Sequence, residues 1–246
     1  MLTFIRMEFL KIKRSKLFYI SLLSGIALPI FMFISAFYIH ALDPNRVLLF
    51  SSYLTNLNMY MNAVLAVFLF CIIVSYLFGR EYTEHTLKSI LTRPVSRKKY
   101  LCGKFLMFLI WILILVTTSF ITCCICSILG GVEGISLSIA VEYYLRILMG
   151  GFLLFLSMSP FVFIGMVMKN IIPGIICGVV AFMINMIAYQ RPYAPYCPWI
   201  SPFIISSGEI YNYSTGLIVP ILILIIVFGI GTILSWLYLA KSDVPL

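Results

Sequence analysis

The sequence has little charge for its length and far more apolar surface than a soluble domain can bury. Charged residues are only 10% of the 246, and the mean hydropathy is +1.11. A soluble domain is about 45–50% apolar, whereas 63% of this chain is hydrophobic. Its apolar runs are continuous, unlike the alternating pattern of a membrane β-barrel. The composition therefore predicts an all-α protein that crosses the membrane several times, as one transmembrane domain over residues 1–246.

Catalytic and nucleotide-binding motifs are also missing. The chain has no GxxxxGK[ST] phosphate loop, no GxSxG nucleophile elbow and no HExxH zinc motif. Its two histidines, His40 and His85, fall on opposite sides of the membrane in the predicted topology. We therefore expect this chain not to be an enzyme and to bind no metal or cofactor of its own.

Seven cysteines give neither a disulfide framework nor a zinc site. Cys123, Cys124 and Cys126 lie close together, but no histidine or second cysteine pair stands at metal-ligand spacing. Most of the others lie in or at the ends of apolar runs. We interpret the cysteines as small buried hydrophobic residues.

Apolar runs long enough to cross a membrane predict six helices, because about 20 residues span a hydrocarbon core of ~30 Å. Pro29 should kink the first helix without ending it. In the N-terminal 16 residues an apolar stripe faces away from most of the basic residues, which predicts a helix lying in the membrane interface. The apolar run that follows is too long for a signal peptide. The six runs cover about residues 17–39, 57–78, 105–129, 144–167, 172–189 and 217–240.

Basic residues are distributed unevenly between the two sides of this topology. Of the 17 Lys and Arg, 14 fall on the side of the N-terminus and of residues 79–104. The other side has only Arg46, Arg146 and Arg191. Because cytoplasmic loops carry the excess of Lys and Arg, both termini should be cytoplasmic. We expect a multi-pass protein of a bacterial cell membrane.

Residues 79–104 form the one long, densely charged segment of the chain. Leu87, Ile90 and Leu91 share one helical face, and Pro94 should end that helix. These features predict a short amphipathic helix at the cytoplasmic surface between two spans. An ordinary basic loop that only sets the topology explains the charge equally well.

Residues 190–215 are rich in proline and aromatic residues and are predicted on the outer side. Closely spaced prolines break a regular helix, yet the segment is too apolar for a solvated loop. It is either a broken, partly re-entrant hairpin or an aromatic belt with a proline-rich turn. Possible substrate contacts in it are Tyr193, Tyr196, Trp199, Phe203 and Glu209.

The spans themselves carry almost no ionisable residue, so the chain offers no site for coupling transport to protons or ions. Energy for any transport should come from another subunit. Gly174 and Gly178 form a GxxxG pattern in the fifth span, which allows two helices to approach closely. The pattern suits either a subunit interface or packing within the chain, with internal packing slightly favoured.

The order of these parts resembles the membrane subunit of a type-2 ABC exporter, and the segment from Glu81 to Lys104 is the most specific match. Its residues Thr86-Leu87, Leu91-Thr92-Arg93-Pro94-Val95-Ser96-Arg97 look like the pattern that these permeases place in their coupling helix. The family often has glycine where this chain has His85. The resemblance covers essentially the whole chain and is strongest to permeases of bacitracin and lantibiotic resistance.

This resemblance implies a separate cytoplasmic ATPase subunit that binds ATP and Mg and docks on the loop. It also implies a second permease copy, identical or related, and export of a membrane-active peptide antibiotic. An exporter of sodium, another small ion or a lipid-linked molecule is the alternative, as is a non-transporting sensor or anchor. The positions that would dock the ATPase or shape the loop are Glu81, Thr86, Leu87, Leu91, Pro94 and Arg97.

Overall fold

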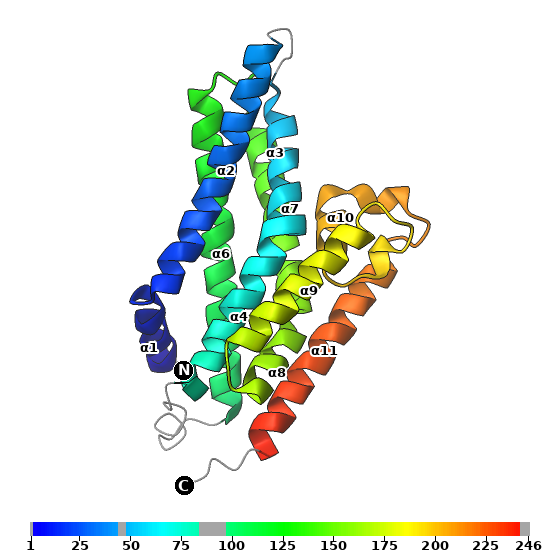
Figure 1. Ribbon diagram of the computed structural model, residues 1–246. Helices are drawn as coiled ribbons and strands as arrows, with labels where there is room; N and C mark the ends of the chain where they lie inside the picture. Colours follow the sequence, from blue (N-terminus) through cyan, green and yellow to red (C-terminus); the bar gives the residue numbers. More distant parts are fainter. Residues whose placement is uncertain (1, 44–47, 84–96, 242–246) are drawn as a thin grey trace.

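The computed structural model describes residues 2–43, 48–83 and 97–241, and helices make up most of them (Figure 1). These residues contain no named strand, which agrees with the predicted all-α class. In chain order the α-helices are α1 (Leu2–Lys13), α2 (Lys16–Leu42), α3 (Phe50–Asn58), α4 (Ala66–Thr83), α6 (Arg97–Leu129), α7 (Leu137–Ser157), α8 (Ser159–Met168), α9 (Ile172–Ala188), α10 (Ser201–Ser207) and α11 (Ile218–Lys241).

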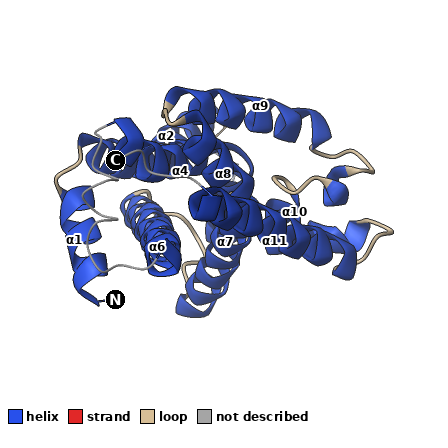
Figure 2. Cartoon of the chain, turned by 90° about the horizontal axis from the view of Figure 1, so that it is seen from below, coloured by secondary structure: helices blue, strands red, loops and turns tan. Residues whose placement is uncertain are grey.

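Five helical stretches within the described residues are long and apolar enough to cross a membrane. They are Lys16–Leu42, Phe50–Glu81, Arg97–Leu129, Leu137–Ser157 and Ile218–Lys241, while α8 and α9 are shorter apolar helices. The protein is therefore a polytopic helical membrane protein. Helix α1 and the last turn of α11 lie at the same end of the molecule (Figure 1). Seen from that end, α1 lies at one edge and α10 and α11 at the other (Figure 2).

The N-terminal segment forms a helix of its own, separate from the first span. Helix α1 ends at Lys13, and Ser15 then caps α2 by accepting a hydrogen bond from the backbone N–H of Phe18 at 3.4 Å. Ser is a favoured residue at this position because its side chain serves one of the unpaired N–H groups at a helix start. The chain thus changes direction between α1 and α2, and α1 packs beside α6.

Pro29 lies inside α2 and does not end it, as the sequence predicts. A proline has no N–H, so the carbonyl of Gly25, four residues earlier, loses its helical partner. The hydroxyl of Ser119 on α6 donates to that carbonyl at 2.8 Å. The Tyr53 hydroxyl on α3 donates to the Pro29 carbonyl at 2.7 Å. Side chains of neighbouring helices therefore satisfy the backbone of α2 around its proline.

The second span contains a π-helical segment, η1 (Met59–Leu65), between α3 and α4. Asn62 on η1 is fully buried, and its amide nitrogen donates to the Asn58 side chain at 2.7 Å and to the Ile147 carbonyl at 3.3 Å. On the other side, the Asn185 amide donates to the Ala63 carbonyl at 3.2 Å. Two buried amides, Asn62 of η1 and Asn185 of α9, thus join the irregular segment to α7 and α9.

The fourth span differs from the prediction of one helix over residues 144–167. Helix α7 starts at Leu137, earlier than predicted, and a break at Met158 separates it from α8. Pro160 explains the break, because in a continuous helix it would lack the N–H for the Leu156 carbonyl and its ring would clash with the preceding turn. Proline is instead tolerated in the first turn of α8.

The GxxxG pattern of α9 packs within the chain, against α4. A Cβ placed on Gly174 would lie 1.8 Å from the Ser75 hydroxyl oxygen, and one on Gly178 would lie 2.6 Å from the Cys71 Cβ. Both distances are far inside van der Waals contact. The two glycines therefore let α9 approach α4 closely, which supports the internal-packing interpretation.

Residues 190–217 connect α9 to α11 through short pieces, η2 (Ala194–Tyr196), α10 and η3 (Glu209–Asn212). This segment is broken, as its prolines predict. It has a small apolar core of its own that includes Ala194, Ile200, Phe203 and Ile210, and this core packs on Ala63 of η1. In Figure 1 the segment lies lower than the far tips of α2 and α6. Its predicted re-entry into the membrane stays a prediction.

Candidate functional site

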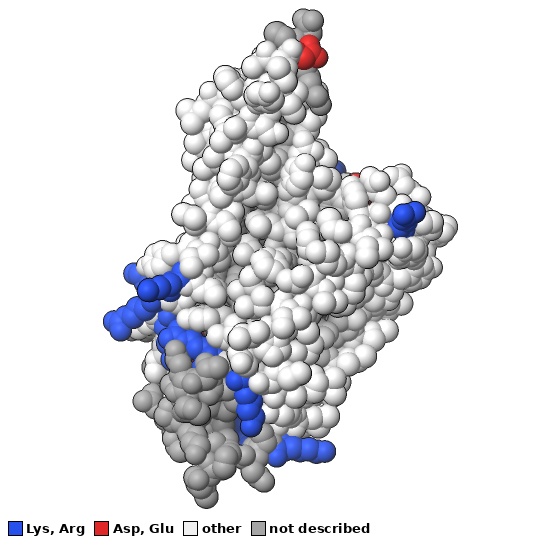
Figure 3. Space-filling model, in the orientation of Figure 1, with Lys and Arg blue, Asp and Glu red and all other residues white. Residues whose placement is uncertain are grey.

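Charged and polar side chains of three helices meet next to the two ends of the segment 84–96, where α4 ends and α6 begins. Glu8 and Lys11 come from α1, Glu81 from the last turn of α4, and Tyr100 and Lys104 from the first turns of α6. We call these five residues the polar joint. The basic residues around it gather at one end of the molecule, and most of the remaining visible surface is uncharged (Figure 3).

Lys104 is the centre of the polar joint. Its ammonium lies 2.7 Å from a carboxylate oxygen of Glu8 and 2.7 Å from one of Glu81, and it donates to the Leu77 carbonyl at 3.0 Å. An ammonium has three N–H donors, so all three have an acceptor. The side chains of Lys104 and Glu8 are each only 3% exposed, which makes these ion pairs buried ones.

The other two members complete the charge balance. Lys11 lies 3.0 Å from Glu8 and 3.4 Å from Glu81, with its own side chain 42% exposed. The Tyr100 hydroxyl donates to the second carboxylate oxygen of Glu81. Two carboxylates therefore face two ammonium groups. A buried pair is tolerated when its charges are matched and its hydrogen bonds made, whereas removing one partner is strongly destabilising.

Burial and the neighbouring charges act in opposite directions on the α1 side chains. Burial alone would raise the pKa of Glu8, but Lys104 and Lys11 outweigh it and hold that pKa below its ordinary value. Burial likewise opposes the charged form of Lys11, while Glu8 and Glu81 raise its pKa. Both side chains are therefore charged at neutral pH.

The polar joint is one of two anchors that tie residues 84–96 to the membrane helices, and the second anchor lies where α6 begins. The Arg97 guanidinium donates to the carbonyls of Leu239 and Ala240 at 2.5 and 2.7 Å. These carbonyls belong to the last turn of α11, where backbone acceptors have no helical partner and a positive charge is favoured. The Lys98 ammonium lies 5.6 Å from the ring of Trp236 on the same helix. The start of α6 is thus fastened to the end of α11.

The structure places only two of the predicted docking or loop-shaping residues. Glu81 is in the polar joint and Arg97 is on the second anchor, so the two do not pair with each other. Both make contacts within the chain, at the start and at the end of the segment that separates α4 from α6. Their role in docking stays a prediction. Outside the described residues lie Thr86, Leu87, Leu91 and Pro94.

The predicted outer residues do not converge on one site. Tyr193 and Tyr196 are exposed, whereas Phe203 is only 2% exposed and its ring packs 6.0 Å from that of Tyr189. Trp199 packs against Phe161, and its indole N–H finds no acceptor among the described residues. Partial burial raises the pKa of Glu209. Their role as substrate contacts stays a prediction.

Sequence reasoning missed Glu8 and Tyr100. A signal for Glu8 exists, because it is the only acidic residue among the first 42, in a segment otherwise rich in basic residues. A lone acidic residue in such a segment indicates a specific basic partner. Nothing in the sequence indicates that this partner is Lys104, nearly one hundred residues later. Among the described residues, no group of three His, Cys, Asp or Glu could hold a metal ion.

The match to a known protein family covers the helices that build both anchors except α11. A family model described as "ABC-2 family transporter protein" matches residues 4–185. The chain is 34% identical over 168 residues to the bacitracin transport permease protein BCRB of Bacillus licheniformis. That alignment includes 68% of this chain and 81% of the relative.

Proposed function

The chain belongs to the ABC-2 family of transporter proteins, and on this basis we propose that it is the permease subunit of an exporter powered by a separate ATPase. The ATP and Mg would be bound by that ATPase, which would dock on residues 79–104 at the cytoplasmic face. The observation that carries this proposal is the pair of anchors, because they tie both ends of the docking segment to the membrane helices.

These anchors suit a segment that transmits force. A displacement of the segment at its α4 end would move Glu81, which is bound through Lys104 to α6 and α1. A displacement at its α6 end would pull on α11 through Arg97. Movement of a docked ATPase would thus reach α1, α4, α6 and α11 together. Two permease copies, with the export path between them, complete the proposed assembly.

Two variants separate docking from force transmission. Leu87→Asp should abolish co-purification of the ATPase, because it places a charge on the apolar face of the predicted docking helix. Arg97→Met should lower export several-fold, because it removes two hydrogen bonds to α11, and an ATPase that still co-purifies with this variant would assign Arg97 to force transmission and not to docking. Leu137→Asp is the matched control, since Leu137 is 81% exposed at the start of α7, on the side predicted to be external. Unchanged co-purification with Leu87→Asp would refute the docking assignment.

We further propose that the exported substrate is a membrane-active peptide antibiotic of the bacitracin class and that export gives resistance. The support is the 34% identity to a protein named as a bacitracin transport permease. Expression of the chain with its ATPase should raise the inhibitory concentration of bacitracin. The permease expressed alone is the control. An unchanged inhibitory concentration across a panel of bacitracin-like and lantibiotic peptides would refute this substrate assignment.

A further inference from the structure

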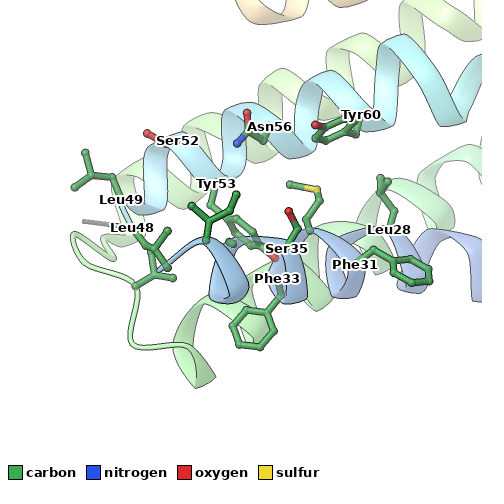
Figure 4. Close-up of a pocket in the computed structure, with 14 residues that line it drawn as sticks. Leu28, Phe31, Phe33, Ser35, Leu48, Leu49, Ser52, Tyr53, Asn56 and Tyr60 are labelled. Carbon is green, nitrogen blue, oxygen red and sulfur yellow. The ribbon is translucent and has the colours of Figure 1, made fainter. Parts of the chain in front are cut away.

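A groove of about 480 Å³ lies between α2 and the α3–η1 stretch, towards the end of the molecule remote from the polar joint (Figure 4). This volume is in the range of small-molecule sites, about 300–1,000 Å³. Apolar and aromatic side chains of α2 form one wall, including Phe31, Met32 and Phe33. The groove opens outwards, since Phe31 is 70% exposed. It is separate from the outer residues 190–215.

The opposite wall carries uncharged polar groups. Ser52, Asn56 and Tyr60 follow one another at intervals of four residues, so they share one face of the α3–η1 stretch, and Ser35 lies on the α2 side (Figure 4). All three of the α3–η1 residues are exposed. The Asn56 side-chain amide makes no hydrogen bond to another described residue. Covering an unpaired amide without giving it a hydrogen-bond partner is costly, so an occupant of the groove should bring hydrogen-bonding groups of its own.

The lining of the groove discriminates between two kinds of occupant. The fourteen lining residues, all in the described part of the chain, include no Lys, Arg or His, and phosphate groups are ordinarily held by such cations. An acyl chain, on the other hand, would leave the amide of Asn56 unpaired. A peptide with apolar side chains fits both walls. Its side chains can pack against the aromatic wall, and its backbone N–H and C=O groups can form hydrogen bonds with the polar wall.

We propose that this groove binds the peptide substrate, with Asn56 pairing to a backbone amide of the peptide and Ser52 and Tyr60 extending the same polar wall. The apolar side chains of the peptide would lie against Phe31 and Phe33. The inference rests on the proposed function, because it assigns a place to the peptide that the exporter carries. The second span then connects the groove to the polar joint, since α3 at one end of this span lines the groove and α4 at the other end carries Glu81.

Binding of fluorescently labelled bacitracin to the permease–ATPase complex in phosphatidylcholine nanodiscs tests the proposal. Asn56→Leu keeps the size of the side chain and removes its amide, so the Kd should rise about tenfold, as for the loss of one or two hydrogen bonds. Ser35→Leu, which adds bulk from the α2 wall, should weaken binding independently. Thr55→Val is the matched control, because Thr55 neighbours Asn56 on α3 but does not line the groove. An unchanged Kd in both groove variants, with Thr55→Val also unchanged, would overturn the proposal.

Two other occupants give distinguishable results, and either would overturn the proposal. If labelled phosphatidylglycerol binds the wild-type complex, and Asn56→Leu abolishes that binding while leaving the Kd of bacitracin unchanged, the groove is a lipid site. If Ser52→Cys forms a disulfide with the same residue of a second copy under oxidising conditions, that copy covers the groove.

Failure of the groove and failure of the proposed function are separable. If the complex gives no resistance but binds bacitracin in a manner that depends on Asn56, the proposed export function fails and the groove assignment holds. If the complex gives resistance that neither Asn56→Leu nor Ser35→Leu lowers, export holds and the groove assignment fails.

Discussion

Lys104 neutralises two carboxylates that come from helices far apart in the sequence. Lys104→Met should destabilise the folded protein by about 3–5 kcal/mol, because Glu8 and Glu81 would stay buried without their main counter-charge. Thermal unfolding of the detergent-solubilised protein measures the effect. Lys13→Met is the control, since Lys13 is an exposed basic residue at the end of α1. A loss no larger than that of Lys13→Met would show that the ion pairs contribute little.

The double variant Glu8→Gln/Lys104→Met refines this test. Residues in contact show non-additive effects on stability. Removing Glu8 also removes one of the two carboxylates that Lys104→Met leaves unpaired, so the double variant should lose less than the two single variants together. Additive losses would mean that the two side chains act independently.

The charges of α1 also predict how stability varies with pH. The pKa of Glu8 is lowered in the folded protein, so its contribution is present above 4.5 and is lost as the pH falls through the lowered value. The pKa of Lys11 is raised, so its contribution is complete below 10.5 and is lost as the pH rises through the raised value. From these two groups we expect a plateau between the limits, measured as unfolding temperature against pH. Glu8→Gln should remove the contribution of Glu8 to the acid limb and also reduce the alkaline limb, because Glu8 is one of the two carboxylates that raise the pKa of Lys11.

At the scale of helices, the α4–α9 contact depends on the absence of side chains. Gly174→Ala should destabilise the protein by about 1–3 kcal/mol, because the new Cβ would overlap the Ser75 side chain on α4. Gly229→Ala in α11 is the matched control, since a Cβ there meets no atom within 4 Å. Unfolding temperatures of both variants measure the difference. Ser75→Ala in the Gly174→Ala background should recover part of the loss by removing the hydroxyl.

The sequence predicts the helices well and their contacts poorly. Hydrophobic runs located the membrane helices, since a bilayer demands long apolar stretches whatever their neighbours. The sequence does not indicate the break at Met158, because proline also occurs inside unbroken membrane helices, as Pro29 does in α2. The π-helix η1 has no sequence signature of its own, and its buried amides reveal their partners only when α7 and α9 are in place.

The candidate site was predictable only in part. Its place in residues 79–104 follows from charge, since a basic segment between apolar runs must lie at a membrane face. The pairing of Lys104 with Glu8 joins residues 96 positions apart and depends on how α1 turns back onto α6. The polar face of the groove likewise depends on α3 lying beside α2. Such contacts come from tertiary packing, which periodicity in one segment does not encode.

At the scale of the whole molecule, the distribution of basic residues predicts the orientation of the chain. Helix α1 and the last turn of α11 lie at the end where Lys and Arg gather (Figures 1 and 3), so both termini should be cytoplasmic. A reporter active only in the cytoplasm should work when fused after residue 246, and one active only outside should not. Fusion after Glu133, in the α6–α7 connection, should give the reverse. The opposite pattern would invert every assignment to an inner or outer face.

The helices of this one chain differ greatly in length, and the lipids around it must accommodate the difference. At 1.5 Å per residue, the 27 residues of α2 extend about 40 Å and the 17 residues of α9 only about 26 Å. The hydrocarbon layer is ~30 Å thick. Helix α9 is therefore shorter than the hydrocarbon layer, whereas α2 is longer and can tilt within it. Where α9 faces lipid, the bilayer should be thinner than beside α2, so the thickness of the host membrane should affect how easily the short helices move.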